Sequence, residues 1–365
     1  MLIVALTSFE RSSTTSNFTF WGIVFAISAS DEAIADAGIK LDPEDTEEQD
    51  RCGVMFGSGI GGLQTISVRS LGANHSCVIR NGVLLSGGSS GQINLGIIPV
   101  SSLESIHFNI GHKDDVLLPA TAFRYGNITS IQTQTFKKDT SKFSAQIEMG
   151  LGSFGTSEAS IGLKSSWKKG FVAISLNYLN SFGNYEYQIP NSGTNEIYKR
   201  QNANIFRYQN DIALGFNSKA GGTRVSYVRS YSDQQLPGAV VLYVSNNQQY
   251  LKLISDQINI SHQFKKNRFV IKGQVDYQYD QTNYTDSIVF NSQGYIHDEY
   301  FFSKLQSNIS TSYFFKRNYT FYGSVAYDRS WLQSTNQSVE SPFRNEIVSV
   351  VGLKKVFPKI RAKIE

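Results

Sequence analysis

Residues 258–279, INISHQFKKNRFVIKGQVDYQY, decide the fold of this chain. From residue 269 onward, two sets of residues alternate: Phe269, Ile271, Gly273, Val275, Tyr277 and Tyr279, against Val270, Lys272, Gln274, Asp276 and Gln278. Side chains of a strand point alternately to its two faces, so the pattern predicts a strand with one apolar face and one polar face. Residues 258–264 alternate in the same way. Only residues 265–268 separate the two segments, which predicts a tight antiparallel hairpin.

The same unit recurs between residues 142 and 353. Short turns lie at residues 168–170, 219–222 and 316–318, and long polar stretches lie at residues 181–207, 233–254, 281–299 and 332–343. We count about ten strands in this pattern and expect a single antiparallel meander. A soluble β-sandwich is the weaker interpretation, because its strands are usually ~5–6 residues long and these are about twice that length.

Short turns on one side and long loops on the other are typical of outer-membrane β-barrels. A bilayer tolerates no unpaired backbone group, and no apolar run here approaches the ~20 residues of a spanning helix. Aromatic residues, which favour the headgroup level, stand at the strand ends: Tyr178, Phe182, Tyr227, Tyr231, Tyr277, Tyr279, Tyr313, Phe314, Tyr327 and Trp331. We therefore predict a mainly β chain that forms part of an antiparallel transmembrane β-barrel, with its apolar faces toward lipid.

Composition argues against several kinds of site. The formal net charge of +4 is spread over 365 residues, without the basic stripe of a nucleic-acid-binding protein. Cys52 and Cys77 have neither metal-ligand spacing nor a Cys-x-x-Cys pattern, and a disulfide between them is left open. Residues 18–29 are apolar, but no positively charged segment precedes them, so we do not expect a signal peptide there. No cofactor and no metal is expected.

The N-terminal segment has a different character. Residues 21–39, WGIVFAISASDEAIADAGI, show helical spacing that stops at Gly38, and residues 53–62, GVMFGSGIGG, predict a short strand and a glycine turn. Residues 19–66 resemble part of the β-ketoacyl-acyl-carrier-protein synthases, which have a thiolase-like fold. The nucleophilic cysteine and the histidines of that family lie downstream of this stretch, and Cys77, in Asn-His-Ser-Cys-Val, does not match their motif. The resemblance therefore implies no catalytic residue.

A dinucleotide site is not predicted either. Residues 57–62 spell Gly-x-Gly-x-x-Gly, but no amphipathic helix opens after them, as that site requires.

From residue 65 the sequence changes again. It contains SVRS at residues 67–70, CVIRNGV at residues 77–83 and IPVSSLESI at residues 98–106. These motifs resemble the plug domain of TonB-dependent outer-membrane receptors, and residues 152–156 and 235–239 resemble their cobalamin-receptor-like branch. Asn81-Gly82 predicts a tight turn with positive φ, and the segment after Pro99 a single helical turn. The TonB box and the first part of the plug are missing, the glycine-rich end of the plug is reduced to residues 123–128, and about half the strands of a ~22-stranded barrel are present.

Three segments follow from these observations. We expect a synthase-like fragment over residues 1–63, an incomplete plug over residues 64–140 and a truncated N-terminal part of the barrel over residues 141–365. The two resemblances meet within residues 62–66 without a linker, so we interpret the chain as a chimera.

The resemblance to receptors implies energised uptake of a scarce ligand, cobalamin-like or siderophore-like, with a TonB-type partner, at the outer membrane. The chain as it stands is expected to be non-functional, to contact outer-membrane lipid and to bind no nucleic acid. Catalytic and ligand-binding residues are not assigned. The alternatives are a condensing enzyme of fatty-acid synthesis and a small outer-membrane pore or adhesin, although a small barrel has an interior filled by side chains and no room for a plug.

Overall fold

The computed structural model describes residues 54–58, 64–68, 75–88, 91–99, 103–110, 115–133, 142–188, 197–219, 221–237, 248–287, 294–335, 341–357 and 362–364. The predicted helix at residues 21–39 and Cys52 lie outside these ranges. Among the described residues, no helix has the length and apolarity needed to cross a bilayer.

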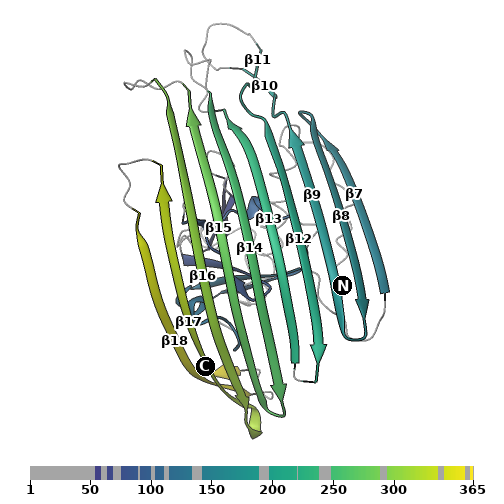
Figure 1. Ribbon diagram of the computed structural model, residues 1–365, viewed down its shortest axis with the longest axis vertical. Coiled ribbons are helices and arrows are strands. Elements are labelled where there is room, and N and C mark those ends of the chain that lie inside the picture. The colour runs from purple at the N-terminus through teal and green to yellow at the C-terminus, as the bar shows by residue number, and fades with distance from the viewer. Residues whose placement is uncertain are drawn as a thin grey trace, which may run out of the picture.

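One large antiparallel sheet dominates the described part of the chain (Figure 1). Its strands are β7 (Lys142–Gly152), β8 (Thr156–Trp167), β9 (Gly170–Ser181), β12 (Ile205–Ser218), β13 (Gly221–Leu236), β14 (Gln249–Lys266), β15 (Phe269–Asp286), β16 (Ile296–Phe314), β17 (Tyr319–Ser334), β18 (Phe343–Phe357) and the short β19 (Ala362–Ile364). Each strand pairs with its neighbour in the sheet order, which follows the sequence from β7 to β19 and is interrupted only by a small separate hairpin between β9 and β12. The predicted meander of about ten strands is confirmed.

The strands are longer than the sequence pattern indicates. β14 and β15 each have 18 residues, and β16 has 19. The predicted loops at residues 233–254 and 281–299 are therefore wrong in extent, because β13 and β14 cover much of the first and β15 and β16 much of the second. The alternating part of β15, residues 269–279, already has the ~9–11 residues that a strand needs to cross a bilayer. The polar remainder of β15 extends the hairpin beyond this alternating part.

Polar side-chain pairs connect the strands in this extension. Asn283 Nδ2 donates to Glu299 Oε1 at 3.0 Å, and the Thr285 hydroxyl lies 3.0 Å from His297 Nδ1. The predicted loop at residues 181–207 also contains structure, the two-residue strands β10 (Glu186–Tyr187) and β11 (Tyr198–Lys199). The sequence predicted loops in these segments because their residues are mostly polar. Strands that pair through polar residues lack the apolar–polar alternation by which a strand is recognised.

The short turns are as tight as the spacing predicts. Only Asn267 and Arg268 separate β14 from β15, and Asn267 has a φ of 53°. A two-residue hairpin turn needs positive φ, which asparagine tolerates better than most residues. The β16–β17 turn contains the 3₁₀ turn η6 (Lys316–Asn318), in which Asn318 has a φ of 62°.

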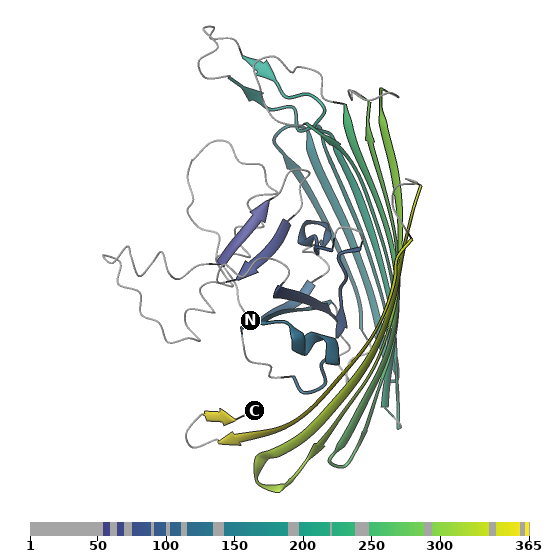
Figure 2. The same cartoon turned by 90° about the vertical axis from the view of Figure 1, so that its left-hand side faces the viewer.

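A smaller domain lies against the concave side of the large sheet, which curves around it (Figure 2). It is a four-stranded sheet in the order β4 (Val83–Leu84), β3 (Ser76–Arg80), β6 (Asn127–Thr133), β5 (Leu103–Ile110), in which β3 and β6 are parallel. Its core of buried residues comprises Cys77, Ile79, Leu84, Leu118, Ala122 and Ile128. We call this domain the plug and the large sheet the wall.

The plug bears out the predicted tight turn. Asn81 and Gly82 have φ values of 52° and 87° and connect β3 to β4. The helical turn expected after Pro99 falls on residues 100–102, outside the described ranges. The described 3₁₀ turns are η3 (Leu95–Ile97), before that proline, and η5 (Ala120–Arg124).

A separate two-stranded hairpin precedes the plug. β1 (Val54–Ser58) pairs antiparallel with β2 (Gln64–Val68). The strand predicted at residues 53–56 is present, and its partner comes from the first plug-like motif, so this pairing spans the expected boundary at residue 63.

Candidate functional site

The two faces of the wall have opposite chemistry. On β15, Val275 is 48% exposed, whereas the flanking Gln274 and Asp276 are 6% and 3% exposed. A soluble protein buries its large apolar residues and exposes its polar ones, but the convex face of this sheet does the reverse. The predicted apolar set of β15 lies on that convex face, and the predicted polar set faces the plug. A continuous exposed apolar face of this kind requires an apolar partner.

Charged side chains limit the apolar band toward the long loops. On the convex face Arg229 of β13 pairs with Asp256 of β14 at 3.5 Å, and Tyr227 donates to the same carboxylate at 2.6 Å. Farther along the sheet, Arg329 lies over the Trp331 ring at 5.9 Å. On β15 the row falls level with Tyr279, so the apolar band below it takes in the alternating segment that starts at Phe269. This segment has about the length that a tilted barrel strand needs to cross a bilayer.

Aromatic rings cluster near the same level. Tyr208 stacks on Tyr231 with ring centroids 4.9 Å apart, and Tyr178 meets Phe206 edge to face at 5.6 Å. Tyr178 and Tyr231 belong to the predicted belt. The predicted belt does not include Tyr208 and Phe206, although their alternation with the buried Arg207 is visible in the sequence.

Side chains of the wall bind the backbone of the plug. Asn308 Oδ1 of β16 accepts a hydrogen bond from the Ala120 amide at 3.2 Å, and Ser310 Oγ donates to the Leu118 carbonyl at 3.1 Å. Ser324 of β17 joins them, with its hydroxyl 3.0 Å from that of Ser310. All three side chains are buried, so each contact replaces water on a group that would otherwise lose its hydrogen bond.

A second set of contacts connects the other side of the plug to β12, β13 and β15. Arg224 Nη2 donates to Thr133 Oγ1 at 3.0 Å, and Thr133 in turn is held by Asn81 through bonds of 2.8 and 3.0 Å. Arg207 Nη1 reaches the Gly96 carbonyl at 3.3 Å, and Gln278 Nε2 reaches the Ser86 carbonyl at 3.4 Å. The plug is therefore hydrogen-bonded to strands on both halves of the wall.

One plug residue carries a buried charge into this interface. Arg80, at the end of β3, is 9% exposed, and burial lowers the pKa of its guanidinium. The wall carboxylates Asp211 and Asp276 act in the opposite direction and raise that pKa. A buried cation without opposite charges is strongly unfavourable, so Arg80 ties the plug to the wall by electrostatics as well as by shape.

The lower edge of the plug makes a third set of contacts with the wall. Phe123 of η5 stacks with Tyr322 of β17 at 6.0 Å, and Arg124 forms an ion pair with Glu346 of β18. These residues lie more than 190 positions apart in the sequence. Neither contact was predictable from local patterns.

One small cavity lies at the interface. The cavity between the plug turn and β14 to β17 has a volume of ≈ 20 Å³ and is lined by Gly82, Val83, Leu84, Pro119, Thr121, Asn259, Gln274, Asp276, Gln306, Ser307, Asn308, Ala326 and Asp328. This is room for about one water molecule. Among the described residues, no cluster of His, Cys, Asp or Glu could hold a metal.

The described structure resembles solved receptors of the bacterial outer membrane. The ferric enterobactin receptor PfeA of Pseudomonas aeruginosa, in a double-mutant form, matches with a TM-score of 0.60 at 12% identity over 90% of this chain and 57% of the receptor. The siderophore receptor PiuA of Acinetobacter baumannii matches with 0.56 at 9% identity over 82% and 51%, and the copper transporter OprC with 0.53 at 9% over 82% and 55%. These are TonB-dependent receptors, and the fold of this chain is a part of their plug-and-barrel fold. The chain spans about half the length of the receptors it matches.

A short segment matches a different protein. Over 44 residues the chain is 57% identical to 3-oxoacyl-[acyl-carrier-protein] synthase 2 of Rhizobium meliloti (strain 1021), which is 12% of this chain and 10% of the synthase. This match supports the synthase resemblance stated for residues 19–66. No family model matches the chain.

Proposed function

We propose that residues 64–365 are part of an outer-membrane receptor that takes up a scarce ligand with energy supplied by a TonB-type partner. The observation that carries the proposal is the interface between plug and wall. Buried wall residues Asn308, Ser310 and Arg207 bind plug backbone, while the opposite face of the same strands is apolar and exposed. A sheet that is polar toward a plug and apolar outward fits a barrel wall between lipid and an occluded lumen.

In this proposal the long loops of the intact receptor bind the ligand. The hairpin β10–β11 projects beyond the wall (Figure 2) and has Tyr187 stacked on Tyr198 at 5.8 Å, with Arg200 over the Tyr187 ring at 6.0 Å. Such rings suit a large, partly apolar chelate or corrin. Movement of the plug would then admit the ligand. This movement requires that the contacts of Arg80 and the hydrogen bonds described above are first broken.

The first test is of the membrane-spanning wall. Single cysteines replace Val275 or Ser261 in a chain in which Cys52 and Cys77 are changed to serine and alanine, and each is labelled with an environment-sensitive fluorophore in lipid vesicles. Brominated lipid should quench the label at position 275 strongly and the label at position 261 weakly. Equal quenching at both positions would contradict the assignment of the faces.

The second test concerns the ligand. Cyanocobalamin and ferric enterobactin are titrated against the full chain in detergent, and binding is followed by tryptophan fluorescence. Replacement of Tyr187 and Tyr198 by serine should weaken any binding that the unaltered chain shows. Undiminished binding in this variant would exclude the β10–β11 hairpin as the ligand site.

A condensing enzyme is the less favoured function. Cys77 is 1% exposed within the plug core, beside Ile79 and Leu84, so the sulfur is not accessible to an acyl thioester. Reactive cysteines are generally accessible and lie in electropositive surroundings. Incubation with an acyl-carrier-protein thioester should leave Cys77 unacylated, as judged by mass spectrometry.

We also propose that the chain joins pieces of two genes, with segments at residues 1–63, 64–140 and 141–365. The abrupt change of resemblance within residues 62–66 supports this. Sequencing genomic DNA across these codons tests it: a chimera predicts that each half continues into its own full-length gene, whereas one uninterrupted reading frame in genomic DNA would contradict it.

A further inference from the structure

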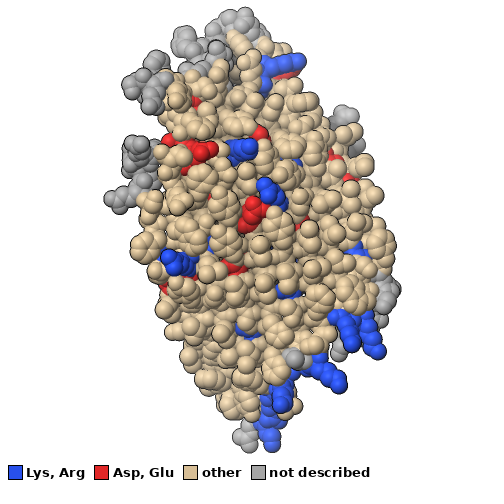
Figure 3. Space-filling view, in the orientation of Figure 1, with Lys and Arg blue, Asp and Glu red and all other residues tan. Residues whose placement is uncertain are grey.

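The end of the wall that carries the short turns is basic. Exposed cations line it in four turns and at the end of β14: Lys168, Lys169, Lys219, Lys265, Lys266, Arg268 and Lys316. The four tight turns themselves, at residues 168–169, 219–220, 267–268 and 315–318, contain no Asp or Glu. Figure 3 shows blue side chains gathered at this lower end of the convex face, whereas acidic and basic residues are mixed toward the loop end.

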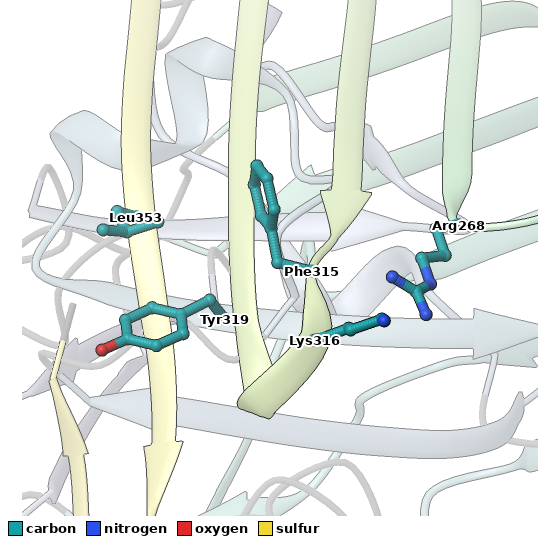
Figure 4. A pocket seen from close by; sticks show the side chains of 5 residues that line it. All are labelled: Arg268, Phe315, Lys316, Tyr319 and Leu353. Atoms are coloured by element: carbon teal, nitrogen blue, oxygen red, sulfur yellow. The ribbon is translucent and has the colours of Figure 1, made fainter.

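Two of these cations share one depression. Arg268, in the β14–β15 turn, and Lys316, in the β16–β17 turn, line it together with Phe315, Tyr319 and Leu353. In Figure 4 the guanidinium of Arg268 and the ammonium of Lys316 point toward one another. Within the described ranges, neither forms an ion pair with a carboxylate. Like charges that converge repel each other, and an anion between them removes that repulsion.

The surroundings of the depression are apolar. Phe315 and Leu353 are 51% and 52% exposed, and Tyr313 meets Phe315 edge to face at 4.6 Å. These side chains continue the exposed apolar band of the wall through Phe269 and Phe321. Tyr319 is held by Lys355, whose Nζ donates to the Tyr319 hydroxyl at 2.7 Å. An occupant of this depression therefore meets cations on the turn side and apolar surface on the band side.

We propose that Arg268 and Lys316 bind the phosphate of an anionic phospholipid headgroup, with the acyl chains lying along Phe315, Leu353 and the apolar band. Guanidinium and ammonium groups are the usual protein partners of phosphate. A free phosphate ion would gain nothing from the exposed rings, whereas a phospholipid covers them. The inference rests on the proposed function only in placing the turn end at a membrane surface.

Lipid binding to the full chain in dodecyl maltoside micelles tests the proposal. Dioleoyl phosphatidylglycerol is titrated and retained lipid is counted by native mass spectrometry, with dioleoyl phosphatidylcholine and inorganic phosphate as comparison arms. The variant is Arg268→Gln with Lys316→Gln. The matched control, Lys199→Gln with Arg344→Gln, removes the same charge at the loop end, where both side chains are also exposed.

The expected result is preference for phosphatidylglycerol over phosphatidylcholine and an affinity lower by about fivefold for each removed cation in the turn variant alone. Arg268→Lys with Lys316→Arg should retain binding, which separates lost charge from misfolding. Three results would each overturn the proposal. They are equal affinity for the two lipids, an equal loss of affinity for phosphatidylglycerol in the loop-end control, and displacement of bound phosphatidylglycerol by millimolar phosphate as effectively as by lipid. Binding in micelles does not require the wall to span a bilayer, so failure here is distinct from failure of the vesicle experiment.

Discussion

The inner and outer faces of the wall are made by the same strands and yet select opposite residues. Along β15, Gln274, Asp276 and Gln278 are all less than 10% exposed, and Val275 and Tyr277 between them are 48% and 39% exposed. Two-residue periodicity alone cannot tell which set is buried. The plug acts as the core for the inner face, because it gives the polar side chains their partners, whereas the apolar side chains of the outer face stay exposed.

The largest expected effect comes from the inner face. Arg80→Met removes the cation that faces Asp211 and Asp276, which are themselves only 6% and 3% exposed. Removing one partner of a buried charge cluster costs about 3–5 kcal/mol, because the remaining charges stay buried. We expect the free energy of unfolding, measured by urea titration of the chain in detergent, to fall by that amount. The plug should also become susceptible to protease.

A second substitution separates charge from packing at this site. In Arg80→Met with Asp276→Asn, one of the uncompensated carboxylates is gone, so part of the lost stability should return. A single variant as stable as the unaltered chain would show that Arg80 does not hold the plug against the wall.

The next effect comes from the outer face. Val275→Arg places a charge in the middle of the apolar band, at a cost of about 2–4 kcal/mol near the centre of a bilayer. Gln274, the neighbouring residue of the predicted polar set, is a poor control. It is 6% exposed and lines the cavity beside Gly82 of the plug, so an arginine there would disturb the plug.

Ser261 provides the better control. It lies beside Gln274 on the inner face of β14 and is only half-buried. Ser261→Arg should insert into lipid vesicles nearly as well as the unaltered chain, and Val275→Arg much less, as measured by protease protection. Equal insertion of the two variants would mean that the faces are wrongly assigned to lipid and lumen.

Local patterns predicted those features that local sequence determines. The alternation in β15, the tight turn at Asn267 and the positive φ at Asn81 and Gly82 all depend on residues a few positions apart. The plug itself was predicted from a resemblance and not from periodicity. What the sequence missed was the length of the strands, because the paired polar residues above the apolar band, such as Asn283 and Glu299, have no alternation to reveal them.

The contacts between plug and wall were also beyond prediction. Asn308 meets Ala120, and Ser310 meets Leu118, across 188 and 192 positions of sequence. Serine and asparagine in a strand are equally compatible with water in an open lumen. The position at which the plug docks determines that these particular residues lose water and bind plug backbone instead. This position depends on the curvature of the whole sheet.

The smallest expected effect tests the upper limit of the outer face. Tyr208 and Tyr231 are direct cross-strand partners on β12 and β13, with nearly parallel rings 4.9 Å apart. Replacing each by leucine, singly and together, should give a coupling free energy of about 0.5–1.5 kcal/mol from a double-mutant cycle of urea unfolding.

On the inner side of the same two strands, Arg207 bonds Ser232 and Gln234 at 3.2 and 3.1 Å. Stacking between uncharged rings depends little on ionic strength, so the tyrosine coupling should persist in 1 M salt. A coupling that vanishes in salt would indicate that the nearby charges Arg229, Asp233 and Lys252, and not the rings, connect these strands at the edge of the apolar band.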